Sequence, residues 1–218
     1  MEGGKWQEHF IELILESQAE ESRPRRNLTV IRQSAYFCRN MNKSGTANLS
    51  SLARRKIFLL QQKWEIAEEE IKAAMAELEA LRLQLLDMVQ ADAEGFEPLA
   101  AAYKLSKDAP GRDAVLEAAT LRACQAPVEM MELCCRAMEQ VALMAEKGSR
   151  LAVSDAGCGA ALLKAGLDAA ALNVYINTRS LQDRAEADRL NAACRQMQQR
   201  YGALAERIYD DVKAALLR

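Results

Sequence analysis

Hydrophobic residues recur at steps of three and four along most of the chain after Lys63, the spacing that places them on one face of a helix. Glutamates take most of the opposite positions over residues 63–91. This pattern predicts a long amphipathic helix that runs to about Ala91. Pro98 then permits a kink or a restart, and the helix can continue from there to Leu105. The apolar positions of the first stretch are Ile71, Met75, Leu78, Leu81, Leu85 and Met88.

A second long helix is predicted from about Arg112 to Lys147, kinked or restarted near Pro127. Gly148 follows its last basic residue and is expected to supply a left-handed stop. The fourth helix is expected to begin after Ser180, because Ser180 and Asp183 stand at the spacing of a capping box. No alternation long enough for a sheet is present, so the sequence predicts an all-α bundle.

The helix between these two is rich in alanine and glycine, and runs from a cap at Ser154 or Asp155 to about Asn177. Small side chains let helix axes approach closely, so we expect this helix at the centre of the bundle. Asn173 and Asn177 are four residues apart and therefore share a face. They either form hydrogen bonds within the core or point into a groove. Asp155 also has two interpretations. It is either a helix cap, which needs no further function, or a residue of the site.

Composition narrows the class of protein. Half of the residues are hydrophobic, 28% are charged and only 5% are aromatic, which argues against a disordered chain and against a loop-rich β-sandwich. No uncharged apolar window is long enough to span a bilayer, and the first residues do not resemble a signal peptide. We therefore expect a cytoplasmic protein that does not bind membranes.

The cysteines and the histidine offer little catalytic chemistry. Six cysteines occur without a CxxC pair, and the chain has one histidine, His9, so no metal site is predicted. Most of the cysteines lie on apolar stripes, which indicates reduced structural thiols. Acid or base chemistry is expected from carboxylates, lysine or water. The cysteines are Cys38, Cys124, Cys134, Cys135, Cys158 and Cys194.

Residues 18–62 differ in kind from the rest of the chain. They contain nine Lys or Arg and two Glu, while the remainder is acidic and alanine-rich. A basic arm of this type would suit nucleic acid, but it has no periodic apolar face and no recognisable reader motif. We therefore do not expect nucleic acid as a partner.

Several separate motifs after this stretch resemble the formiminotransferase-cyclodeaminase family, which includes stand-alone methenyltetrahydrofolate cyclohydrolases. They are SRLAVSDAG at residues 149–157, NVYINTRSL at 173–181, DAEGF at 92–96 and AAYKL at 101–105. The resemblance covers about residues 64–218, together with the short stretch FIEL at residues 10–13. It implies a cyclodeaminase-like helical domain over residues 1–218, with the four helices partly kinked and the N-terminal segment atypical.

The departure from the family lies in residues 18–62, where members usually carry a proline- and glycine-rich loop and an alanine-rich helix. This stretch contains one glycine, Gly45. It is either a divergent replacement or a non-native segment, such as a shifted reading frame or a cloning artefact. Resequencing the coding DNA would decide between these explanations.

The resemblance implies a folate enzyme, acting either on 5,10-methenyltetrahydrofolate by hydrolysis or on 5-formiminotetrahydrofolate with loss of ammonia. The expected catalytic residues are Asp155, stabilising the positive amidinium carbon, and Lys104, binding the glutamate tail or moving protons. Substrate binding is expected from Asn173, Asn177, Asp92 and Ser154. No cofactor is implied, because the tetrahydrofolate derivative is the substrate.

The resemblance also implies a homodimer. An alternative of a different class stays open: a catalytically inactive structural or interaction protein of the same fold. Long amphipathic helices with an alanine-rich centre suit such packing equally well.

Overall fold

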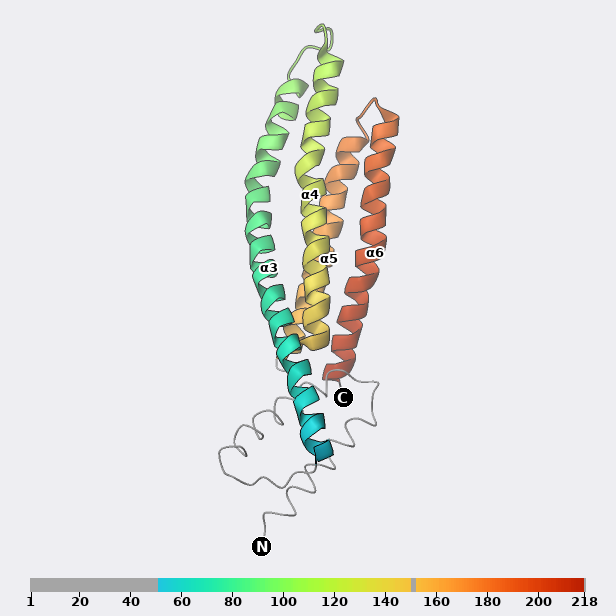
Figure 1. The fold of residues 1–218 in the computed structure, drawn as a ribbon. Coiled ribbons are helices and arrows are strands. Elements are labelled where there is room, and N and C mark those ends of the chain that lie inside the picture. Colours follow the sequence, from blue (N-terminus) through green and yellow to red (C-terminus); the bar gives the residue numbers. More distant parts are fainter. Residues whose placement is uncertain (1–50, 150–151, 218) are drawn as a thin grey trace. The chain divides into compact units, whose positions relative to one another are not determined.

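The computed structural model describes residues 51–149 and 152–217, with side chains from Glu65 onward, and over these residues it contains four α-helices and no strand (Figure 1). The all-α prediction is confirmed for this part of the chain. His9, Cys38 and most of the divergent stretch 18–62 lie outside the described residues. The helices are α3 (Ser51–Tyr103), α4 (Arg112–Lys147), α5 (Val153–Thr178) and α6 (Arg184–Leu216).

Both internal prolines lie inside uninterrupted helices. α3 does not end near Ala91 but continues through Pro98 to Tyr103, so of the two alternatives the helix continues and does not restart at the proline. α4 has the predicted bounds and continues through Pro127. A proline removes one backbone donor, and packing of the long apolar faces on either side keeps each helix in one piece.

The C-terminal end of α4 also differs from the prediction. Among the described residues the only positive φ belongs to Gly111, at 76°, in the turn that leads into α4. Gly148 is therefore not left-handed. Lys147 in the last turn and Asp113 in the first turn of α4 complement the helix dipole, which stabilises both ends without a glycine stop.

The starts of the last two helices differ from the expected caps. α5 begins at Val153, so Ser154 and Asp155 lie inside its first turn rather than at the cap. α6 is capped by Asp183, whose carboxylate accepts the Glu186 N–H at 3.0 Å. The Ser180–Asp183 box is therefore wrong by three residues, because Asp183 is itself the cap.

The chain divides into two compact units. The first comprises Met1–Ala74 with Glu146–Val153. Its described part includes the N-terminal half of α3. There Lys72 lies 3.3 Å from Glu68 and 3.0 Å from Glu69. Glu70 of α3 pairs with Lys147, the last residue of α4. Exposed ion pairs of this kind contribute little to stability.

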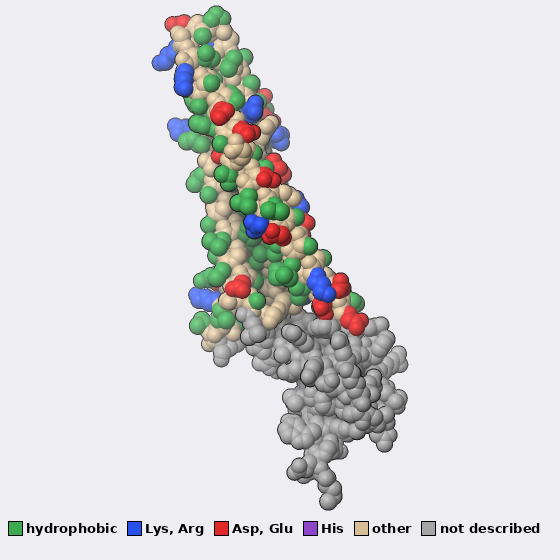
Figure 2. All heavy atoms as spheres, turned by 90° about the vertical axis from the view of Figure 1, so that its left-hand side faces the viewer, with side chains coloured by type: hydrophobic (Ala, Val, Ile, Leu, Met, Phe, Trp, Pro, Cys, Tyr) green, Lys and Arg blue, Asp and Glu red, His purple; other side chains and the backbone are tan. Residues whose placement is uncertain are grey.

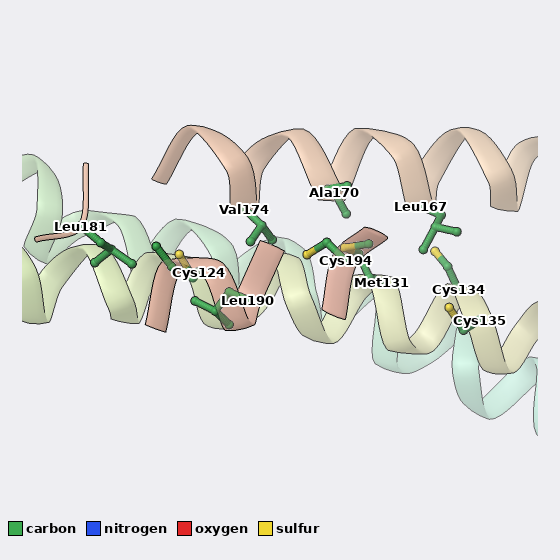
Figure 3. Close-up of a cluster of buried hydrophobic side chains, with 12 residues drawn as sticks. Cys124, Met131, Cys134, Cys135, Leu167, Ala170, Val174, Leu181, Leu190 and Cys194 are labelled. Atoms are coloured by element: carbon green, nitrogen blue, oxygen red, sulfur yellow. The ribbon is translucent and has the colours of Figure 1, made fainter. Parts of the chain in front are cut away.

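The second unit, Met75–Ala145 with Ser154–Arg218, contains the hydrophobic core and every candidate site residue. Its largest cluster joins α4, α5 and α6, with side chains of α5 pointing at the thiols and methionine of α4 (Figure 3). Leu81 of α3 packs on Leu133 and Ala137 of α4, and the partly buried Leu163 of α5 packs against this second cluster. α4 therefore contacts all three other helices.

The central position belongs to α4 and not to α5. Fourteen residues of α4 are buried, against seven of α5. Small residues do bring α5 close to its neighbours: a Cβ added to Gly157 would lie 2.9 Å from Cγ1 of Val212 on α6. Close approach needs small residues on one face only, so the alanine content of α5 did not require a central position.

α5 is the one helix in the described part of the chain that is long and apolar enough to cross a membrane by length and composition. Only 28% of its most apolar window is buried against the rest of the protein. Two of its charged side chains, Lys164 and Asp168, pair with each other at 3.1 Å.

Candidate functional site

Asn177 fills a gap in the hydrogen bonding of α4. In an α-helix the carbonyl of residue 123 accepts the N–H of residue 127, but Pro127 has no N–H. The Asn177 side chain supplies the missing donor, with Nδ2 at 3.2 Å from the Ala123 carbonyl oxygen. This contact supports the structural interpretation of Asn177. The Oδ1 atom of Asn177 has no hydrogen-bond partner among the described residues.

Asp92 and Asn173 lie one turn away from this contact at the same height along α4. A Cβ added to Gly95 would lie 3.6 Å from the carbonyl oxygen of Arg122, next to the carbonyl that Asn177 contacts. α3 and α5 both run antiparallel to α4 (Figure 1), so one turn back along each brings Asp92 and Asn173 level with Pro127. The structure therefore brings Asp92 and Asn173 to one height along α4, about one turn from the Asn177 contact.

The exposure of these side chains differs. Asn173 is exposed, and its Nδ2 lies 3.4 Å from the carbonyl of Ala169 one turn earlier. Asp92 and Asn177 are half-buried. Asn173 is therefore the side chain of this group that is most accessible to a ligand.

Asp155 and Ser154 lie at the other end of α5. Both are exposed, and neither side chain forms a hydrogen bond or ion pair with any described residue. Asp155 precedes Asn173 by eighteen residues in one helix, which separates them by about 27 Å. A single subunit consequently does not bring the predicted catalytic carboxylate to the asparagine pair.

Lys104 follows the last residue of α3, and its backbone N–H donates to the carbonyl of Ala101 at 3.1 Å. The side chain is exposed. Twelve residues separate it from Asp92, or roughly 18 Å if the path is helical. An extended substrate that contacts Asp92 could reach Lys104 with its far end.

A polar chain between α5 and α6 was missed in the sequence analysis. Tyr175 Oη donates to Gln198 Oε1 at 2.8 Å, Gln198 Nε2 donates to Asp168 Oδ1 at 2.8 Å, and Lys164 Nζ donates to Asp168 Oδ2 at 3.1 Å. Burial pushes the pKa of Asp168 upward, but the bonds from Gln198 and Lys164 outweigh it, so that pKa lies below its usual value. The available signal was a Lys–Asp pair at i,i+4 spacing in an otherwise apolar helix.

The turn between α5 and α6 is held by charged side chains from both directions. The Glu117 carboxylate of α4 accepts the backbone N–H groups of Gln182 and Asp183 at 2.8 and 2.9 Å. Arg184 donates to the carbonyls of Thr178 and Leu181 at 3.1 and 3.2 Å. These bonds satisfy backbone groups at the end of α5, and so fix the C-terminal half of the helix that carries Asn173 and Asn177.

The thiols of the second unit are structural. Burial raises the pKa of Cys124 to about 11 and that of Cys135 to about 12, which disfavours the reactive thiolate. Cys134 and Cys194 are also buried, whereas Cys158 is exposed on α5. Over residues 51–149 and 152–217, no group of three or more His, Cys, Asp or Glu side chains is arranged to hold a metal ion.

Comparison with known proteins gives three findings. The sequence profile described as formiminotransferase-cyclodeaminase matches residues 48–196. The chain is 34% identical over 158 residues to the methenyltetrahydrofolate cyclohydrolase of Methylorubrum extorquens. The aligned residues make up 71% of this chain and 76% of that protein. It also resembles the crystal structure of formiminotetrahydrofolate cyclodeaminase from Thermotoga maritima, with a TM-score of 0.49 and 19% identity over 88% of this chain and 85% of that one.

Proposed function

This chain belongs to the formiminotransferase-cyclodeaminase family, and we propose that it is a cytoplasmic methenyltetrahydrofolate cyclohydrolase that works as a homodimer. The observation that carries the proposal is the 34% identity to a methenyltetrahydrofolate cyclohydrolase over 76% of that protein. All six candidate side chains fall within residues 48–196, the part of the chain that matches the family. The family match begins within the divergent stretch 18–62, and leaves most of that stretch outside it.

The reaction adds water to the positively charged carbon that bridges two nitrogens of the folate. The water oxygen becomes the formyl oxygen, one carbon–nitrogen bond breaks, one water proton goes to the released nitrogen and the other goes to solvent. A carboxylate beside this carbon lowers the energy of the cation and can take the proton of the attacking water. In our proposal Asp155, an exposed carboxylate without a described partner, has this role.

The remaining residues would bind and orient the substrate. The amides of Asn173 and Asn177 offer donors and acceptors to the pterin ring, which carries both, and Ser154 precedes Asp155 on the same turn. Asp92 is level with Asn173 and can accept from the ring. Lys104 would bind the carboxylates of the glutamate tail, because its exposed ammonium lies at the C-terminal end of α3.

The test is the loss of methenyl absorbance with purified full-length protein. Asp155→Asn should stay folded by circular dichroism and lower kcat at least roughly tenfold, since it removes a charge needed at the reacting carbon. Asp188→Asn, which changes an exposed carboxylate of α6, is the matched control and should keep wild-type turnover. Lys104→Met should raise KM with little change in kcat. Asp155→Asn protein that is unstable yet retains its specific activity would contradict the catalytic role.

Cyclodeamination of 5-formiminotetrahydrofolate is the second candidate, and the name of the matched family supports it. Ammonia release from the formimino substrate, measured beside methenyl hydrolysis, separates the two activities. A chain without either activity would still be a helical interaction protein. Thermal stabilisation by methenyl, formyl and formimino folates addresses that case, since a ligand at 100 times its Kd adds about 2.7 kcal/mol of stability.

A further inference from the structure

The height of Phe96 along the bundle follows from two contacts on one turn of α4. A Cβ added to Gly95 of α3 would lie 3.6 Å from the carbonyl oxygen of Arg122. Asn177 of α5 donates to the carbonyl oxygen of the next residue, Ala123, at 3.2 Å. Gly95 and Asn177 are therefore level with each other. Phe96 follows Gly95 in α3, so it lies within about one turn of Asn177 along the bundle axis.

This comparison of heights holds over the length of α5, because α5 keeps one alignment along α4. A Cβ added to Gly166 would lie 3.5 Å from Sγ of Cys134. One added to Gly159 would lie 3.7 Å from Cγ2 of Val141. Counted from Asn177, successive contacts are eleven and then seven residues apart on both helices. α3 and α5 both run antiparallel to α4 (Figure 1), so rising residue numbers on these two helices lead toward the same end of the bundle.

Phe96 projects from the side of α3 that adjoins α5. Leu78 lies eighteen residues earlier, five full turns, so the two side chains point in about the same direction. Leu78 and Leu163 of α5 pack against the same cluster, which places this side of α3 next to α5. Figure 2, seen from the α3 side, shows hydrophobic side chains at the surface along the described helices. Phe96 is the one phenylalanine whose side chain the structure describes, and it is 52% exposed.

Three kinds of side chain follow one another along this part of the bundle. The amides of Asn173 and Asn177 come first, and the ring of Phe96 follows. The ammonium of Lys104 comes last, eight residues or about 12 Å beyond Phe96 if the path is helical. Folates have the same order of groups: a pterin with hydrogen-bond donors and acceptors, a flat aminobenzoyl ring with apolar faces, and a glutamate tail with carboxylates. The aromatic ring of the series thus stands where such a ligand is flat and apolar.

We propose that Phe96 binds the aminobenzoyl ring of the folate by stacking, between the asparagines that bind the pterin and the lysine that binds the glutamate tail. Stacking suits a flat conjugated ring, and it removes water from an exposed apolar surface. The methenyl carbon joins a pterin nitrogen to the nitrogen that carries this ring, so a fixed ring also holds the reacting carbon in place. The inference rests on the proposed function for its ligand, and gives Phe96 a binding role.

The first experiment is a binding titration of the full-length protein with 5-formyltetrahydrofolate, which has no methenyl bridge to hydrolyse. Phe96→Ala should raise Kd roughly tenfold, because it removes the stacking surface. Phe96→Leu should also raise Kd, since it keeps an apolar side chain but not the flat ring, whereas Phe96→Tyr should bind like the wild type. Val89→Ala, at a side chain of α3 that is 70% exposed, is the matched control and should keep the wild-type Kd.

The outcomes separate the inference from folding and from the proposed function. Phe96→Ala should unfold at the wild-type urea concentration, because the side chain is half exposed. A wild-type Kd in this variant, or a wild type without affinity for 5-formyltetrahydrofolate, would overturn the inference. Methenyl hydrolysis by the wild type would in either case leave the proposed function intact. Binding that depends on Phe96 in a protein without turnover would contradict only the proposed function.

A second experiment identifies the part of the ligand that Phe96 contacts. p-Aminobenzoylglutamate and 6-methyltetrahydropterin are used as competitors of 5-formyltetrahydrofolate binding. Phe96→Ala should weaken competition by p-aminobenzoylglutamate roughly tenfold and leave competition by the pterin unchanged. Asn173→Ala should show the opposite pattern, because its amide is assigned to the pterin. A loss for the pterin in Phe96→Ala, or for neither competitor, would contradict the stacking of the aminobenzoyl ring.

Discussion

α4 and α5 both contribute to the core of the second unit, but they meet different surroundings. α4 buries fourteen residues, and the exposed side of its middle part is polar and charged. α5 buries seven residues on one side and exposes leucines and an isoleucine on the other. Helix composition alone therefore does not decide which helix is central. Position depends on how many neighbours a helix has, and α4 contacts all three other helices.

The largest expected difference between the two helices is in core stability. Met131→Ala removes a side chain of α4 that is 0% exposed, and should lower the free energy of unfolding by about 2–5 kcal/mol. Leu172→Ala, at a side chain of α5 that is 68% exposed, should change the free energy of unfolding by less than about 0.5 kcal/mol. Urea titrations of both variants measure the difference. Equal losses would show that this side of α5 is buried.

The next difference separates the two asparagines of α5. Asn177→Ala leaves the carbonyl of the buried Ala123 without a donor, and should cost about 1–3 kcal/mol. Asn173→Ala is the matched control, since its contact is only with its own helix at 3.4 Å and it should cost little. Chemical denaturation of the two proteins side by side makes the comparison. Similar stabilities would mean that the α4 contact contributes nothing.

A smaller effect is expected from coupling between Asn177 and Pro127. Pro127→Ala restores a backbone N–H that can satisfy the Ala123 carbonyl within α4. Asn177→Ala should therefore cost less in the Pro127→Ala protein than in the wild type, by roughly 0.5–1 kcal/mol in a double-mutant cycle. Additive effects would show that the asparagine does not substitute for the missing donor.

The smallest expected effect is an alkaline loss of stability. Burial raises the folded pKa of Cys124 to about 11 and of Cys135 to about 12, above the usual 9.0. The folded state therefore holds protons that the unfolded state releases, so this contribution is complete below about pH 9 and is lost as the pH rises through 11 and 12. Unfolding free energies should fall between pH 8 and pH 9 by about 0.4 kcal/mol less in Cys135→Ala than in the wild type. The exposed Cys158→Ala should keep the wild-type slope.

Much of the fold follows from local patterns in the sequence. The bounds of α4 were predicted because its apolar period and its charged ends are local signals. The sequence left open a kink or a restart at Pro98 and at Pro127, and neither helix restarts there, since the packing that keeps these helices continuous involves residues far away in sequence. The capping box was misplaced because two acceptors, Ser180 and Asp183, stood at usable positions and only the path of the chain selects between them.

The candidate site was only partly accessible from sequence. Spacing placed Asn173 and Asn177 on one face, but could not show that Asn177 contacts the carbonyl opposite a proline. Motif resemblance grouped Asp155 with the asparagines, although about 27 Å of helix separates them in one subunit. A hydrogen bond across helices leaves no periodic trace in a single sequence.

The bond between Asn177 and Ala123 also has a consequence for the alignment of α5 along α4. A helix face made largely of alanine offers few features to distinguish one packing register from another. Sliding α5 by one turn would leave the carbonyl before the proline and the asparagine amide both without partners, at a cost that alanine packing cannot recover. The missing backbone donor in α4 therefore fixes the register of α5 along α4, because only one alignment satisfies both polar groups.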